Sequence, residues 1–205
     1  MTGTCTKKST TSGYIVYKKS LLTCSNGDCF EKSSPSGFYK NSDSDSTNKP
    51  LIKCATDCES KPSSDGYYIN AGTTGETDIL FSCSNNVCSE TGSTGGFYLN
   101  TGDPENNPVI KCSIFNCTPI STSSIKTSCA AAGDIVNSDG IKYYCPTTSN
   151  DDIIEIVTSN TPKFYYFTTT SNPFDGSSLG AETNYLIKSV NKAAISMTEN
   201  TSGIL

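Results

Sequence analysis

Short apolar segments alternate with polar segments along the first part of the chain, and the pattern returns about every thirty residues. Each unit opens on a glycine followed by aromatic residues, as in Gly66-Tyr67-Tyr68, and passes through a polar spacer to an apolar run such as Val109-Ile110. β-Branched and aromatic residues favour strands, while turn-forming residues fill the spacers. The pattern therefore predicts an array of small β-hairpin repeats.

A close pair of cysteines follows each apolar run. The pairs are Cys24 with Cys29, Cys54 with Cys58, Cys83 with Cys88, and Cys112 with Cys117. From the second cysteine of a pair, eight residues lead to the glycine of the next repeat, and Cys5 leads to Gly13 by the same step. We therefore interpret Cys5 as the second cysteine of a repeat whose first half lies outside the chain.

Two disulfide schemes fit this spacing. In the first scheme each close pair bridges itself, Cys129 joins Cys145, and Cys5 is unpaired. The second scheme joins Cys5 to Cys24, Cys29 to Cys54, Cys58 to Cys83, and Cys88 to Cys112. Loop entropy gives roughly 2 kcal/mol for the short loops and about 3.5 kcal/mol for the long ones, a difference that strain can cancel. The first scheme leaves only Cys5 unpaired, which favours it. The constant step of eight residues from each second cysteine to the next glycine favours the second scheme. We prefer the first.

The chain changes character near residue 118, beyond which only Cys129 and Cys145 remain. Asn137-Ser138-Asp139-Gly140 separates two apolar runs and ends in Asp-Gly, which is typical of a hairpin turn. Further strands are expected over residues 153–157, 163–168, 185–190 and 194–197. We expect an all-β fold, with a cysteine-rich repeat array of about four repeats over residues 1–118 and a small β-sandwich or barrel module over residues 119–205.

Composition indicates an extracellular, non-catalytic protein. The 205 residues include eleven cysteines but no histidine and no tryptophan, and the net charge is −5. So many paired cysteines are typical of an oxidising compartment, and an acidic chain does not fit a nucleic-acid partner. The close pairs lack the Cys-x2-Cys spacing of zinc sites, and without histidine the usual catalytic triad is missing. We expect no enzyme activity, no cofactor and no metal.

Targeting signals are missing as well. Met1 is followed by polar residues rather than a signal peptide, and no apolar stretch is long enough to span a bilayer. We therefore expect the chain to be a fragment of a larger secreted protein that does not itself insert into membranes.

The second aromatic of each full glycine–aromatic segment is a tyrosine: Tyr39, Tyr68 and Tyr98. Adjacent side chains on a strand point to opposite faces, so one ring of each pair would pack inward and the other would face solvent. A ladder of exposed tyrosines could bind a protein partner or stack on sugar rings. The plainer interpretation, which we favour, is that both rings shield a thin core.

The run Gly66-Tyr67-Tyr68-Ile69-Asn70-Ala71-Gly72, followed by a polar spacer and an apolar run into a cysteine pair, resembles the repeats of scaffoldins from anaerobic gut fungi (Neocallimastigomycetes). Lys49-Pro50-Leu51-Ile52-Lys53-Cys54 is similar to the other half of that repeat. The resemblance covers residues 5–117 and is looser downstream. It implies membership of a very large secreted protein that holds a cellulosome together, with cohesin-like binding of the small dockerin domains of plant-cell-wall hydrolases.

Three functions therefore enter as hypotheses. The leading one is a non-catalytic scaffoldin fragment that binds dockerin domains. The alternatives are a carbohydrate-binding module for polysaccharide and a purely structural extracellular spacer or stalk.

Overall fold

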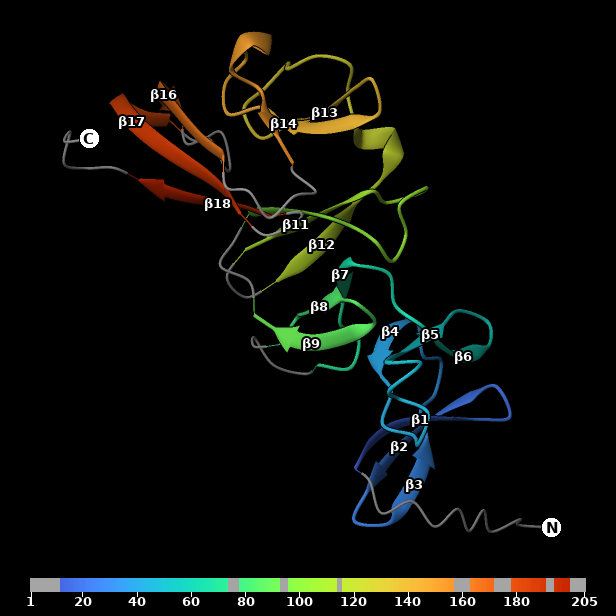
Figure 1. The fold of residues 1–205 in the computed structure, drawn as a ribbon. Coiled ribbons are helices and arrows are strands. Elements are labelled where there is room, and N and C mark those ends of the chain that lie inside the picture. The colour runs from blue at the N-terminus through green and yellow to red at the C-terminus, as the bar shows by residue number, and fades with distance from the viewer. Residues whose placement is uncertain are drawn as a thin grey trace. The chain divides into compact units, whose positions relative to one another are not determined.

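The structure, a computed structural model, describes residues 12–73, 78–92, 96–113, 116–156, 163–171, 178–190 and 194–199. These residues form short β-strands together with two 3-10 turns, η1 (Thr122–Ser124) and η2 (Asn150–Asp152) (Figure 1). The all-β prediction is confirmed. The part of the chain that the structure describes contains no helix long and apolar enough to cross a membrane. The chain divides into two compact units, Met1–Thr91 and Gly92–Leu205.

Each repeat of the first unit is a three-stranded antiparallel sheet whose strands follow one another in chain order. The predicted hairpin supplies the first two strands, and the segment after the second cysteine adds a third. The strands are β1 (Gly13–Tyr17), β2 (Ser20–Ser25) and β3 (Asp28–Glu31), then β4 (Gly37–Lys40), β5 (Leu51–Cys54) and β6 (Cys58–Lys61), then β7 (Gly66–Ile69), β8 (Leu80–Ser84) and β9 (Val87–Thr91).

Each close pair of cysteines links the second and third strands of its own repeat. In the first repeat, for example, Cys24 on β2 lies directly opposite Cys29 on β3. The structure contains the disulfides Cys24–Cys29, Cys54–Cys58, Cys83–Cys88, Cys112–Cys117 and Cys129–Cys145, which are the pairs of the first scheme. Cys5 lies outside the described residues. Closing one of the short loops stabilises its repeat by roughly 2 kcal/mol. This many disulfides fits an extracellular protein.

Consecutive repeats share their hydrophobic cores. The first inter-repeat core contains Leu21 from β2 together with Tyr39 and Ile52 from the second repeat. The second inter-repeat core contains Leu51 from the second repeat together with Tyr68 and Phe81 from the third. A sheet of three strands of four to six residues cannot bury enough apolar surface by itself, so each repeat of the first unit depends on its neighbour.

Backbone hydrogen bonds also join neighbouring repeats. The amide N–H of Ser42, just after β4, donates to the carbonyl oxygen of Tyr14 on β1 at 2.8 Å. In the next pair of repeats the N–H of Ala71 donates to the carbonyl oxygen of Phe38, also at 2.8 Å. The same connection recurs at equivalent positions, so the repeats stack in a regular way.

The glycine that opens each repeat has a backbone conformation that other residues rarely adopt. The φ angle is +128° at Gly13 and +97° at Gly37. A Cβ atom on Gly37 would lie 2.9 Å from the Cβ of Ala71 in the following repeat. Glycine is therefore needed both for its backbone conformation and for the close approach of the next repeat.

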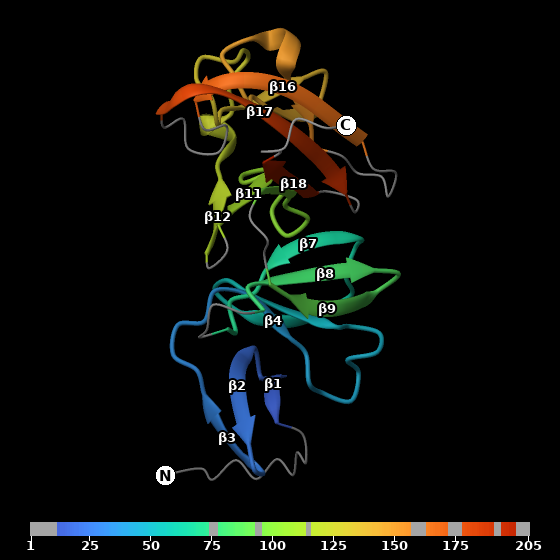
Figure 2. The same cartoon turned by 90° about the vertical axis from the view of Figure 1, so that its left-hand side faces the viewer.

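The second unit contains the fourth repeat and the downstream segment. The fourth repeat comprises β10 (Gly96–Leu99), β11 (Val109–Cys112) and β12 (Cys117–Ile120). The downstream strands are β13 (Ile135–Ser138), β14 (Ile141–Tyr144), β15 (Ile154–Glu155), β16 (Lys163–Ser171), β17 (Ser178–Val190) and β18 (Ala194–Glu199). β18 pairs with β10, which produces a six-stranded sheet in the order β12-β11-β10-β18-β17-β16 (Figure 2). The compact units of the structure separate between residues 91 and 92. The division predicted near residue 118 stays a prediction.

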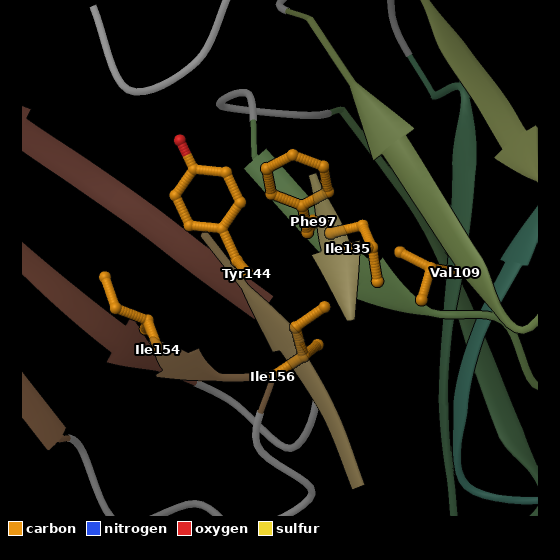
Figure 3. Packing of buried hydrophobic residues seen from close by; sticks show 6 residues of the cluster. All are labelled: Phe97, Val109, Ile135, Tyr144, Ile154 and Ile156. Atoms are coloured by element: carbon orange, nitrogen blue, oxygen red, sulfur yellow. The ribbon is translucent and has the colours of Figure 1, made fainter. Parts of the chain in front are cut away.

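One core joins the six-stranded sheet to the three-stranded sheet β13-β14-β15. Phe97 on β10 packs beside Tyr144 on β14, with their ring centres 4.7 Å apart (Figure 3). Val109 on β11 belongs to the same core as Ile135 and Ile154 of the smaller sheet. Two sheets thus enclose one apolar layer in the manner of a small sandwich, and one of those sheets includes the fourth repeat.

The hairpin predicted around Asp139-Gly140 is present. β13 and β14 pair antiparallel, and the two turn residues have φ angles of +50° and +83°. Positive φ at both central residues is the conformation that twists correctly into a two-residue hairpin, which is why Asp-Gly occurs there.

Asp134 organises the approach to β13. Its carboxylate accepts hydrogen bonds from the backbone N–H groups of Ala130 and Ala131 and pairs with Lys126 at 2.8 Å. Burial raises the pKa of this carboxyl, but the hydrogen bonds from Lys126 and the two backbone groups outweigh burial, so the pKa lies below its usual range. The ionised carboxylate is therefore the form that the fold stabilises.

We expect Gly37→Ala to lower the free energy of unfolding by at least about 1 kcal/mol more than Gly27→Ala, because the new methyl group must also displace Ala71. Gly27 is the matched control, since its φ is +89° and no atom lies within 4 Å of the position of a Cβ. Urea unfolding followed by tyrosine circular dichroism measures both changes in the same unit. Equal losses in the two variants would contradict a close contact between the repeats at Gly37.

We expect Asp134→Asn to destabilise the protein more at about pH 7 than at about pH 2.5. A folded pKa below the unfolded value of about 3.9 adds stability above that pH, and this stability is lost as the pH falls through the folded pKa. Thermal unfolding at both pH values measures the effect, with the exposed Asp151→Asn as control. A difference between wild type and variant that does not change with pH would contradict the role of the carboxylate.

Candidate binding site

A buried asparagine closes the hairpin loop of each full repeat. Asn41, Asn70 and Asn100 stand four residues after the opening glycine and are no more than 7% exposed. In each case the side-chain amide donates to a carbonyl oxygen across the loop, at 2.7 Å from Asn41 to Lys49. The side-chain oxygen accepts from the backbone two residues on, as from Asp43 to Asn41 at 3.0 Å. In the second repeat these two bonds hold the hairpin loop in one shape.

These asparagines were not among the residues predicted from the sequence. Their constant step from the glycine was the signal that could have identified them. The first repeat has Tyr17 at this step, and its β1 and β2 are joined directly through Lys18 and Lys19, whose φ angles are +48° and +69°. A two-residue turn has no loop carbonyl for an asparagine to bind, which explains why this repeat departs from the pattern.

In the second and third repeats, the turn closed by the disulfide contacts the hairpin loop of the preceding repeat. The amide nitrogen of Asn86, in the turn between β8 and β9, donates to the carbonyl oxygen of Asn48 at 2.8 Å. One repeat earlier, the backbone N–H of Cys58 donates to the carbonyl oxygen of Lys19 at 2.8 Å. The disulfide therefore rigidifies a turn that is hydrogen-bonded to the neighbouring repeat.

A pocket of about 300 Å³ lies between the loop of the second repeat and the disulfide turn of the third. This inter-repeat pocket is lined by Lys40, Asn41, Ser46, Thr47, Pro50, Asn86, Val87 and Cys88. Val87 is 67% exposed, and Pro50 is buried beneath the loop. The lining offers a proline ring, a valine side chain and a disulfide, all of which favour apolar ligands.

Three polar side chains that line the inter-repeat pocket have partners within the protein: those of Lys40, Asn41 and Asn86. Lys40 pairs with Glu90 at 2.9 Å, which balances one charge with another beside the pocket. The amide of Asn41 is bonded to the loop, and that of Asn86 to the carbonyl oxygens of Thr47 and Asn48. The pocket is therefore suited to an uncharged, mainly apolar group rather than to a phosphate or a carboxylate.

The tyrosines considered as possible partner-binding residues are buried, which fits the favoured interpretation that these rings shield a thin core. Tyr39, Tyr68 and Tyr98 are 2%, 5% and 6% exposed. On the second repeat, Tyr39 faces the preceding repeat and contacts the ring of Tyr14, with centres 5.0 Å apart. Phe38 points the opposite way and contacts Tyr68 of the following repeat at 5.0 Å. The alternation of side chains was anticipated, but a neighbouring repeat covers each face of the sheet.

The hydroxyl groups of these buried rings bond to the backbone. Tyr39 donates to the carbonyl oxygen of Ser36 at 3.2 Å, and Tyr68 to that of Ser64 at 3.1 Å. Burial raises the pKa of both phenols above the usual range, although the bonds to Ser36 and Ser64 act in the opposite direction. Both side chains therefore serve the fold as neutral, hydrogen-bonded core residues.

Among the residues that the structure describes, no group of three or more cysteine, aspartate or glutamate side chains is placed to hold a metal ion.

No protein-family model matches the chain, and neither the curated proteins nor the solved structures yield a match.

We expect Asn41→Ala to lower the free energy of unfolding by about 2 kcal/mol, because the carbonyl of Lys49 and the N–H of Asp43 lose the buried amide that bonds to both. Asn48→Ala, in the same loop but exposed, should cost less than about 0.5 kcal/mol. Urea unfolding compares the two variants. Similar effects would mean that the buried amide does not hold the loop.

Proposed function

We propose that this chain is a non-catalytic part of a secreted scaffoldin that binds dockerin domains of plant-cell-wall-degrading enzymes. The proposal rests on the resemblance of residues 5–117 to gut fungal scaffoldin repeats and on one observation of the structure. That observation is the inter-repeat pocket, whose apolar lining comes from one disulfide-bonded turn and from the hairpin loop of the preceding repeat.

The pocket is suited to one apolar side chain of a protein partner. At about 300 Å³ it has room for an aliphatic or aromatic side chain. Such a side chain, buried at the centre of an interface, typically contributes much of the binding free energy. Because disulfides and buried asparagines hold the surrounding loops in place, little conformational entropy would be lost on binding.

The two alternative functions have less support. A sugar-binding platform on the repeats required exposed tyrosines, and Tyr39, Tyr68 and Tyr98 lie in the core. A purely structural spacer would need the stacked repeats but not an apolar pocket at the surface. An absence of dockerin binding would favour the spacer.

We expect Val87→Asp to weaken binding of a purified gut fungal dockerin by a factor of about 30 or more, because a carboxylate would be desolvated in the apolar pocket. Calorimetry with the oxidised chain measures the affinity. Val87 is largely exposed, so the substitution should leave the fold intact.

Phe30→Asp is the matched control, since Phe30 is a 71% exposed apolar residue on β3 that does not line the pocket. Loss of binding in Phe30→Asp but not in Val87→Asp would put the contact on the first repeat and contradict the role of the pocket. No binding by the folded wild type to several dockerins would contradict the proposed function itself.

A further inference from the structure

Two aromatic rings are exposed on the outer face of β16. Phe164 is 60% exposed and Tyr166 is 56% exposed, whereas Tyr165 between them packs against the core of the second unit. Lys163 pairs with Glu155 of β15 on that same inner side. The alternation along the strand thus separates an inner row, which belongs to the fold, from an outer row of rings that the core does not use.

The outer row has a regular spacing. Alternate residues of a strand lie roughly 7 Å apart, so the rings of Phe164 and Tyr166 follow one another along a line. Thr168 is also exposed and continues the same face. The hydroxyl of Thr168 donates to the side-chain oxygen of Asn184 on the adjacent β17 at 2.7 Å. Two rings are therefore followed by a hydroxyl and an amide group.

The described side chains of the outer row are uncharged. Phe164, Tyr166 and Thr168 are exposed on β16, and Thr168 is bonded to the uncharged Asn184 of β17. Such groups do not select an anionic ligand or a basic peptide.

We propose that the outer face of β16 and β17 binds a neutral polysaccharide, with Phe164 and Tyr166 stacking on successive sugar rings. Flat aromatic faces suit the C–H surfaces of a sugar ring, while the threonine hydroxyl and the asparagine amide exchange hydrogen bonds with sugar hydroxyls. The row is open and linear, which suits a chain rather than a single small molecule. This binding is independent of the inter-repeat pocket and of dockerin recognition.

Strand addition by a peptide accounts for the surface less well. Among the described strands, β16 lies at the end of the six-stranded sheet, so its edge could pair with another strand. A strand added at the edge would bind backbone groups and would leave the faces of Phe164 and Tyr166 in water. The two exposed rings are therefore better explained by a ligand that lies across the face.

The test is depletion of the full, oxidised chain from solution by insoluble cellulose and, separately, by insoluble xylan. Wild type should bind one or both, and Phe164→Ala with Tyr166→Ala should weaken binding by about tenfold or more. Tyr166→Trp should bind at least as well as wild type, because a larger flat ring replaces a smaller one. Phe30→Ala, which removes an exposed ring from β3, should bind as wild type does.

Circular dichroism and thermal unfolding must show that the double variant folds as wild type does. If it does not, the single variants Phe164→Ala and Tyr166→Ala are compared instead, and each should weaken binding. Failure of the wild type to bind either polysaccharide, or equal binding by wild type and the folded variants, would overturn the proposal. Wild type that binds neither polysaccharide but self-associates through these rings in sedimentation would show a protein contact instead, and would overturn the proposal as well.

Discussion

The sharing of hydrophobic cores between consecutive repeats is the constraint on which the first unit depends. A three-stranded sheet whose strands are four to six residues long has two faces and too few side chains to cover either one. In the second repeat Tyr39 fills the core shared with the preceding repeat, and Phe38 contacts Tyr68 of the following one. Each repeat is therefore stable only in its place in the stack, because burial of its apolar side chains is completed by a neighbour.

Disulfides and buried asparagines perform complementary tasks in this stack. The disulfide ties the second strand to the third within one repeat, and Asn41 fixes the loop between the first and second strands. The disulfide turn of one repeat contacts the hairpin loop of the preceding repeat. Asn86, for example, donates to the carbonyl oxygen of Asn48. The inter-repeat pocket lies at this junction, between the hairpin loop of the second repeat and the disulfide turn of the third. The two loops carry few large apolar side chains, so they do not fill the space between them.

The second unit uses the same kind of repeat differently. Its fourth repeat shares its core with the downstream sheet, where Phe97 lies beside Tyr144. β18 extends the sheet of this repeat by pairing with β10. The six-stranded sheet then presents one face to the core and leaves Phe164 and Tyr166 exposed on the other. Burial on one side of a long strand and exposure on the other separates structural rings from those available for binding.

The repeat, the all-β class and the Asp139-Gly140 turn were determined by the sequence, because each depends on local backbone preference and on spacing along the chain. The two disulfide schemes stayed open, since spacing fits both and only the register of β2 with β3 puts Cys24 opposite Cys29. Burial of Tyr39, the third strand of each repeat and the pairing of β18 with β10 were decided by the tertiary structure alone. The reason is physical: alternation tells which side chains share a face, but only the neighbouring repeat or strand decides whether that face is covered.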